Sequence, residues 1–174
     1  TVTLLYNPSE LWLMTELEKQ DVYACALALP TPDEPICAEW VAEIARQVER
    51  SSHDDVYLVG HSLGVPAILR YLELPHAHTI QGAVLVAGPC EKNNNKKLDS
   101  FLDTPFDFET IRSNCQACSI IHGDNDPLVP LQNAQILSEK LHAPLRIIQN
   151  GGHLNGSSGW HALPECLVQL NSMM

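Results

Sequence analysis

The chain has 174 residues, of which 45% are hydrophobic and 18% charged, and its formal net charge is −11 at pH 7. This length predicts one domain over residues 1–174 with a full core, and the composition argues against disorder. With only 10 Lys and Arg residues, the chain lacks the positive charge that binds nucleic acids and anionic membranes. No apolar run reaches the roughly 18 residues of a membrane-spanning helix. We therefore expect a cytoplasmic protein, and the composition does not indicate its oligomeric state.

Short apolar runs rich in β-branched residues alternate with amphipathic segments of helical length. In chain order, we expect a strand over residues 2–6, a helix over 9–19, a strand over 22–29, a helix over 36–50, a strand over 55–60, a helix over 63–72, strands over 81–87 and 117–121, a helix over 131–142, a strand over 145–149 and a helix over 160–170. Residues 83–87 are apolar at every position, which is typical of a parallel strand buried on both faces. The alternation predicts an α/β fold, a three-layer α/β/α sandwich. Residues 88–105 are polar and irregular, and they are expected to form a mobile excursion or a small lid.

Six cysteines are spread along the chain. A chain of this length does not need disulfides for stability, so we interpret them as buried, reduced thiols. Cys115 and Cys118 have the spacing of a redox or zinc motif, but no second pair of this kind and no His pair at zinc-finger spacing accompanies them. We therefore expect no metal site.

The segment Gly60-His61-Ser62-Leu63-Gly64 follows a buried strand and precedes an apolar helix. A Gly-x-Ser-x-Gly motif in this context is typical of a serine nucleophile, because small residues let the strand and the helix approach closely around a tight turn. We predict that Ser62 is the nucleophile. The N–H of Leu63 is the first donor expected to stabilise an oxyanion.

A serine hydroxyl needs an imidazole base, which a carboxylate in turn orients. Two carboxylates, Asp124 and Asp126, follow the fifth predicted strand. Gly123, Asp126, Val129 and Pro130 fit the frame Gly-x-x-Asp-x-x-Val-Pro, which commonly carries the acid in α/β-hydrolases, whereas Asp124 does not fit it. We predict Asp126 as the acid and keep Asp124 as the alternative.

Eight histidines are candidates for the base. His153 comes directly after two glycines that follow the sixth predicted strand, and it completes the chain order Ser, acid, His of the α/β-hydrolases. His161 lies close by but is expected to begin the last helix. His61 and His122 are interpreted as packed or orienting groups, so we predict His153 as the base.

Six segments of the chain together carry a resemblance to a known family. They are Leu27-Ala28-Leu29-Pro30, Pro35 with Trp40, Val59-Gly60-His61-Ser62-Leu63-Gly64, Arg70-Tyr71-Leu72, Asp126-Pro127-Leu128-Val129-Pro130 and Gly151-Gly152-His153-Leu154-Asn155. The chain resembles the YdeN-like serine hydrolases related to retinoblastoma-binding protein nine, a compact branch of the α/β-hydrolases. The resemblance covers most of the chain. It implies a six-stranded parallel sheet of order 2-1-3-4-5-6 without a large cap, and hydrolysis of small carboxylic esters.

The chain departs from this family at two places. Relatives carry His-Gly and a glycine-rich loop after the first strand, which supplies the second oxyanion donor, whereas this chain has Tyr6-Asn7-Pro8-Ser9. The backbone of Asn7 is the donor that we expect there. The retinoblastoma-binding member is associated with a Leu-x-Cys-x-Glu motif, and residues 35–39 have Pro in place of its Leu. We therefore do not expect that partner.

Three functions fit these residues. We expect a hydrolase of small carboxylic esters that works through an acyl-enzyme, with a small-molecule ester as its partner and without a cofactor. One alternative is a degenerate hydrolase that serves as a binding or scaffold protein, which the short first loop favours and the complete set of Ser62, Asp126 and His153 disfavours. The other is a thioesterase, amidase or acyltransferase, since these reactions pass through the same acyl intermediate.

Overall fold

The six strands form one sheet in which every neighbouring pair is parallel. The computed structural model describes residues 1–5, 10–51, 55–75 and 77–174. The strands are β1 (Val2–Leu5), β2 (Ala24–Ala26), β3 (Tyr57–His61), β4 (Ile80–Val86), β5 (Cys115–Gly123) and β6 (Leu145–Ile148). Their order in the sheet is β2-β1-β3-β4-β5-β6, which confirms the predicted order.

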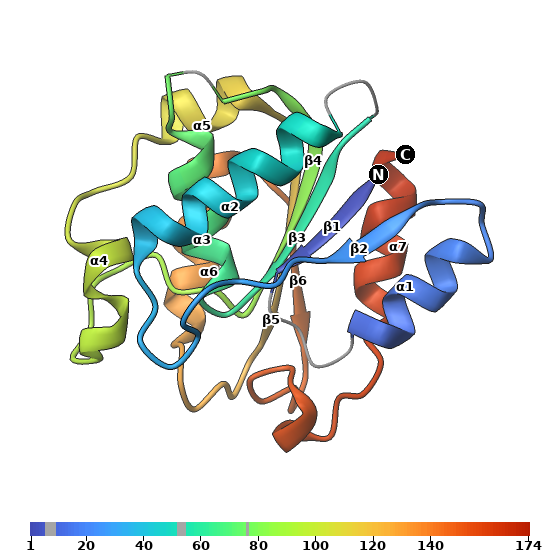
Figure 1. Cartoon of the computed structure of the whole chain (residues 1–174). Coiled ribbons are helices and arrows are strands. Elements are labelled where there is room, and N and C mark those ends of the chain that lie inside the picture. Colours follow the sequence, from blue (N-terminus) through green and yellow to red (C-terminus); the bar gives the residue numbers. More distant parts are fainter. Residues whose placement is uncertain (6–9, 52–54, 76) are drawn as a thin grey trace.

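Helices cover both faces of this sheet (Figure 1). One face carries α2 (Cys37–Arg50), α3 (Gly64–Leu72), α4 (Asp99–Leu102), α5 (Phe108–Asn114) and α6 (Leu131–Leu141), and the other carries α1 (Glu10–Glu18) and α7 (Pro164–Met173). The three layers confirm the predicted α/β/α sandwich. Within the described ranges, no helix has both the length and the apolar character needed to cross a membrane.

The sheet separates two hydrophobic cores, and alternate residues of each central strand enter one or the other. In β4, Ala83 and Leu85 pack with α2, α3 and α6, while Val84 and Val86 pack with α1 and α7. All four side chains are 0–1% exposed. This double burial explains why the run over residues 83–87 is apolar at every position.

Element boundaries differ from the predictions at β2, which spans three residues where a strand over 22–29 was expected, at the C-terminal end of the chain, and between β4 and β5. The prediction that the last helix begins at residue 160 is wrong, because α7 begins at Pro164, a residue suited to the first helical turn. Trp160 instead lies in the preceding loop, where its indole N–H donates to the Gly151 carbonyl at 2.8 Å. Helix α5 was not expected; the Asp107 side chain caps it by accepting from the Thr110 N–H at 3.1 Å.

The segment between β4 and α5 contains a 3-10 turn (Lys96–Leu98) and the short helix α4, where an irregular stretch was expected. Arg70 of α3 anchors this segment. Its Nε donates to the Phe101 carbonyl at 2.8 Å, and its guanidinium lies 3.9 Å from the centre of the Phe106 ring. An ion pair of 2.7 Å with Glu73 keeps the guanidinium in place.

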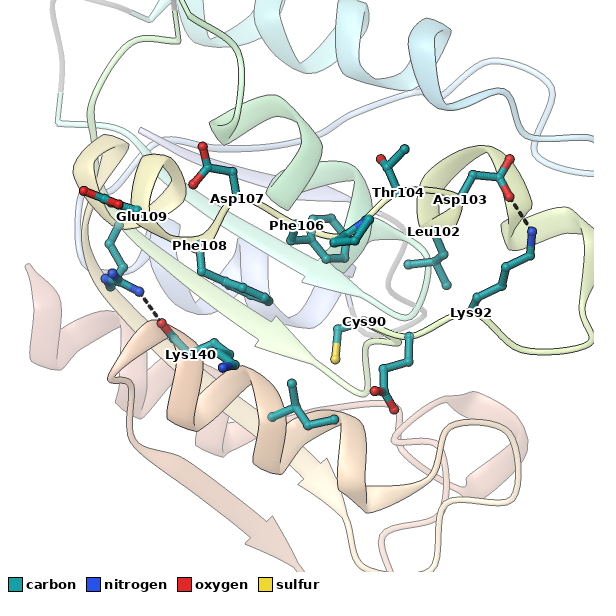
Figure 2. A pocket seen from close by; sticks show the side chains of 14 residues that line it. Cys90, Lys92, Leu102, Asp103, Thr104, Phe106, Asp107, Phe108, Glu109 and Lys140 are labelled. Carbon is teal, nitrogen blue, oxygen red and sulfur yellow. Dashed lines mark hydrogen bonds and ion pairs between the residues drawn. The ribbon is translucent and has the colours of Figure 1, made fainter.

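A cavity of about 760 Å³ lies between this segment and α6 (Figure 2). Phe106, Phe108 and Cys90 line its interior, and an ion pair of 2.5 Å joins Lys92 to Asp103 at its rim. Burial raises the pKa of the Cys90 thiol to about 12. Because this thiol stays protonated at neutral pH, it is a poor nucleophile, and Cys90 does not make this cavity a reactive site.

Candidate active site

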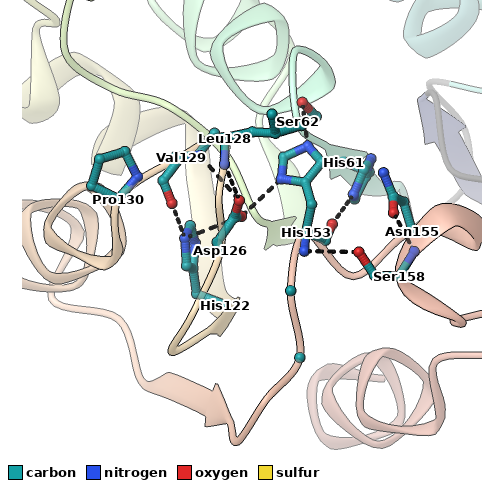
Figure 3. Close-up of polar contacts among 12 residues, drawn as sticks. His61, Ser62, His122, Asp126, Leu128, Val129, Pro130, His153, Asn155 and Ser158 are labelled. Carbon is teal, nitrogen blue, oxygen red and sulfur yellow. Dashed lines mark hydrogen bonds and ion pairs between the residues drawn. The ribbon is translucent and has the colours of Figure 1, made fainter.

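Three side chains predicted from separate parts of the sequence meet at the carboxyl edge of the sheet (Figure 3). Ser62 follows β3, Asp126 follows β5 and His153 follows β6. His153 Nε2 lies 3.0 Å from Ser62 Oγ, and His153 Nδ1 lies 2.8 Å from Asp126 Oδ2. The structure thus brings the three predicted residues into one hydrogen-bonded row.

Ser62 occupies a tight turn between β3 and α3. Its φ angle is +52°, in the left-handed region that a non-glycine residue rarely adopts. The turn requires small neighbours, because a Cβ on Gly64 would lie 2.7 Å from the Leu5 carbonyl oxygen and a Cβ on Gly60 would lie 2.8 Å from the backbone of Gly64. The local geometry therefore matches the strand–turn–helix that the motif predicts, with Ser62 half-buried at its tip.

Asp126 is held by its own loop as well as by His153. Its side chain is fully buried, and its Oδ1 accepts from the backbone N–H groups of Leu128 and Val129 at 2.8 and 3.0 Å. Burial acts to raise the pKa of this carboxyl, but the hydrogen bonds from His153, Val129 and Leu128 outweigh burial and lower the pKa below its ordinary value of 3.8. The carboxylate is therefore ionised at neutral pH.

Asp124, the alternative acid, lies outside this row. The residue is exposed, and its Oδ1 accepts from the N–H of Asn150 at 2.8 Å. Asp124 thus joins two loops at the sheet edge, while the geometry places Asp126 against the histidine.

The imidazole of His153 is buried, with 4% of the residue exposed. Because the ionised Asp126 can only accept, Nδ1 carries the proton, and Nε2 is left to accept from the Ser62 hydroxyl. The backbone of His153 is fixed on both sides: its N–H donates to Ser158 Oγ at 3.2 Å, and its carbonyl accepts from His61 Nε2 at 2.8 Å. His161 is exposed in the loop before α7 and takes no place in this row.

Of these supporting residues, Ser158 was missed by the sequence analysis. It lies in a short 3-10 turn, Gly156–Ser158, and a lone serine in a polar loop carries no pattern that marks it. His61 and His122 are both buried beside the row, as expected of packed or orienting groups.

Of the two predicted oxyanion donors, Leu63 lies within the described residues and Asn7 does not. Leu63 directly follows Ser62 and forms the N-cap of α3, so its N–H belongs to the helix terminus beside the serine. Asn7 lies outside the described residues, together with the rest of residues 6–9. The assignment of Asn7 as second donor therefore stays a prediction.

A cavity of about 460 Å³ opens at Ser62. One wall is apolar and comes from the acid loop, residues 127–130, with Leu98 and Pro89 nearby. Asn93, Asn94 and Asn95 also line it. No charged side chain lines this cavity in the described part of the chain, so it suits a small, uncharged group.

No cysteine takes part in the row from Ser62 to Asp126. All six cysteines are free. The Cys115 and Cys118 sulfurs are 3.4 Å apart, well beyond the roughly 2.05 Å of an S–S bond, so they are two thiols in contact. Among the described residues, no three His, Cys, Asp or Glu side chains are grouped to hold a metal ion.

Comparison with known proteins places the chain among hydrolases. A family model described as serine hydrolase matches residues 8–172. YdeN of Bacillus subtilis (strain 168) is 32% identical over 155 residues, which cover 88% of this chain and 81% of YdeN. The crystal structure of the ydeN gene product from B. subtilis matches with a TM-score of 0.90 and 29% identity, covering 99% of this chain and 97% of that one.

A mammalian relative gives the same assignment. Serine hydrolase RBBP9 of Rattus norvegicus is 24% identical over 148 residues, which cover 84% of this chain and 77% of RBBP9. The family model spans nearly the whole chain, and relatives from a bacterium and a mammal agree with it. The chain therefore belongs to the serine hydrolase family and is an enzyme of the serine hydrolase type.

Proposed function

We propose that the enzyme hydrolyses small carboxylic esters through an acyl-enzyme formed on Ser62, with His153 as the base and Asp126 as the acid. The observation that carries this proposal is the continuous row from Ser62 Oγ through His153 to Asp126, with separations of 3.0 and 2.8 Å. Both separations are within the range of a working nucleophile–base–acid set.

In the first half of the reaction, Ser62 Oγ attacks the ester carbonyl carbon while His153 Nε2 takes the hydroxyl proton. The Asp126 carboxylate stabilises the imidazolium that forms. When the tetrahedral intermediate collapses, the alcohol leaves with the proton from His153, and the acyl group remains on Ser62. A water molecule then attacks the acyl carbon in the same way, while His153 takes a proton from it. The carboxylic acid product leaves, and His153 returns the proton to Ser62 Oγ.

The negative charge that develops on the carbonyl oxygen needs donors near Ser62. The N–H of Leu63 is adjacent in the chain and belongs to the N-terminus of α3, where the helix dipole also favours negative charge. The backbone of Asn7 is proposed as the second donor. Losing one donor of this kind typically lowers the rate by about 10²–10³-fold, so the contribution of Asn7 decides how efficient the enzyme is.

The cavity at Ser62 supports a short acyl group. Its volume of about 460 Å³ lies at the small end of ligand sites, and it is open to solvent past the exposed Leu128. Burying each further CH₂ of an acyl chain would contribute about 0.8 kcal/mol, or roughly a fourfold gain in kcat/KM, if a tunnel received it. We expect no such gain, and the best substrates to be acetyl to butyryl esters.

Two measurements test the proposal. A fluorophosphonate probe labels the wild-type enzyme covalently, and Ser62→Ala loses the label while retaining its circular dichroism spectrum. A series of p-nitrophenyl esters from acetyl to decanoyl, at fixed ionic strength, has its highest kcat/KM at or below butyryl. Persistent labelling of Ser62→Ala would move the nucleophile to another residue, and an optimum at decanoyl would require a lipid-sized pocket.

A further inference from the structure

A second histidine faces the acid from the side opposite His153. His122 lies near the end of β5, and its ring is fully buried. Its Nε2 lies 2.9 Å from the Val129 carbonyl oxygen and 3.5 Å from Asp126 Oδ2 (Figure 3). Asp126 Oδ2 is therefore placed between two imidazoles, of which only His153 reaches Ser62.

The acceptors around His122 determine its tautomer. The Val129 carbonyl can only accept, so Nε2 carries the proton and donates to it, with the Asp126 carboxylate as a longer second acceptor. Burial lowers the pKa of His122 below its ordinary value of 6.5, against the opposing effects of the Val129 carbonyl and Asp126. The ring is thus neutral, and its Nδ1 is a bare acceptor.

This Nδ1 is buried and finds no hydrogen-bond partner within the described part of the chain. A buried acceptor without a partner destabilises the folded state, and a phenyl ring at this place would avoid that penalty. The imidazole is therefore poorly explained as a packing residue alone. Its distinguishing feature is the Nε2 donor, which is aimed at the loop that carries the acid.

Apart from the bond between Asp126 and His153, the hydrogen bonds that the Asp126 side chain makes with described residues lie within its own loop. Asp126 accepts from the N–H groups of Leu128 and Val129, which fixes the carboxylate relative to its own turn. The bond from His122 to the Val129 carbonyl is the contact that ties this turn to the end of the rigid strand β5. Without it, the turn and its carboxylate could move together relative to His153.

We propose that His122 is a positioning residue, which anchors the 126–129 turn to β5 and so holds Asp126 Oδ2 in line with His153 Nδ1. This inference rests on the proposed function of Ser62, His153 and Asp126. His122 touches neither the serine nor the substrate cavity, so it acts only through Asp126.

The test compares two substitutions. His122→Phe keeps the ring volume but removes the donor, and His122→Gln keeps an amide donor near the position of Nε2. Active sites are counted by fluorophosphonate titration, so that any unfolded fraction is excluded from kcat. On p-nitrophenyl acetate, we expect His122→Phe to lower kcat by roughly 10–100-fold, the scale of a misplaced catalytic group, with KM nearly unchanged. His122→Gln is expected to recover most of that loss.

Two further readouts separate positioning from a structural role. The acid limb of the kcat/KM profile should move in the same direction for His122→Phe as for Asp126→Asn, since both weaken support of the imidazolium. In an Asp126→Asn background, His122→Phe should have little further effect, because the two residues act through one contact. A lower melting temperature with unchanged kcat per active site, or effects that multiply in the double variant, would overturn the inference.

A measurement without turnover keeps this inference separate from the proposed function. The proton NMR resonance of the His153 Nδ1–H, shifted downfield by its bond to Asp126, is expected in the wild type and in His122→Gln but weakened or lost in His122→Phe. If His122→Phe does not fold, His122→Asn replaces it, because its shorter amide cannot reach the Val129 carbonyl. An unchanged resonance in the variant that lacks the contact with the Val129 carbonyl refutes the positioning role even if no ester is hydrolysed.

Discussion

Replacing Asp126 by Asn tests the proposed triad most sharply, because the surrounding hydrogen bonds dictate how the new side chain is oriented. In the wild type, Oδ1 accepts from two backbone N–H groups of the acid loop, and Oδ2 accepts from His153. An asparagine amide has one oxygen and one NH₂ group. Its oxygen must take the position of Oδ1, since an NH₂ group facing two N–H donors would be repelled.

The NH₂ group of the introduced amide then faces His153 Nδ1, which can no longer donate and must become the acceptor. The ring proton moves to Nε2, the atom 3.0 Å from Ser62 Oγ, and His153 loses its capacity to take the serine proton. A wrong tautomer of this kind lowers kcat by about 10⁴ in a serine protease, and we expect about 10³–10⁴ here. This loss corresponds to roughly 4–5.5 kcal/mol of transition-state stabilisation.

The assay is hydrolysis of p-nitrophenyl acetate by wild type, Asp126→Asn and the matched control Asp124→Asn. Asp124 is exposed and its side chain accepts from the Asn150 N–H, outside the row from Ser62 to Asp126, so its substitution should change kcat less than about fivefold, within the range of a small loop adjustment. If Asp124→Asn proves the more damaging of the two, or if Asp126→Asn retains a tenth of wild-type activity, the assignment of the acid is refuted.

Three further predictions concern stability and reactivity. Ser62→Gly should abolish turnover yet raise the free energy of unfolding by about 1 kcal/mol in urea denaturation, because glycine tolerates the φ angle of +52°. The lowered pKa of Asp126 stabilises the fold above the ordinary value of 3.8, and this contribution is lost as the pH falls through the lowered value. Asp126→Asn should therefore lose less stability than the wild type below about pH 5, which urea denaturation at a series of pH values would measure. With its pKa raised to about 12, Cys90 should resist iodoacetamide at pH 8 in the native protein and react in urea, as peptide mass spectrometry would show; rapid native labelling would contradict its burial.

The strands and the candidate site could be predicted because their signals are local and strong. Residues 83–87 are apolar throughout, which is typical of a strand buried on both faces. Ser62, Asp126 and His153 each follow a predicted strand, and in a parallel sheet the carboxyl ends of all strands meet at one edge. The chain order Ser, acid, His and the position of each residue after a strand were therefore enough to predict that three residues distant in the sequence form one site.

Other features depend on contacts that no local pattern records. Helix α5 has seven residues and buries only Ile111, too little for a helical periodicity to emerge. Trp160 was assigned to the last helix because it adjoins an apolar run, but its bond to the Gly151 carbonyl keeps it in the loop. The contact of His122 with the acid loop joins residues seven positions apart through a turn, and the identity of a histidine does not reveal which atom it binds.

The attachment of the segment between β4 and α5 has a consequence for substrate range. Arg70 fastens it near Phe101 and Phe106, whereas residues 93–95, which line the cavity at Ser62, are exposed and fill no core. Side chains there can be exchanged without leaving a void or altering the turn at Ser62. This part of the cavity lining is thus encoded apart from the residues that hold the reacting groups, so a library confined to residues 93–95 can vary the cavity while every member keeps Ser62, His153 and Asp126 in place.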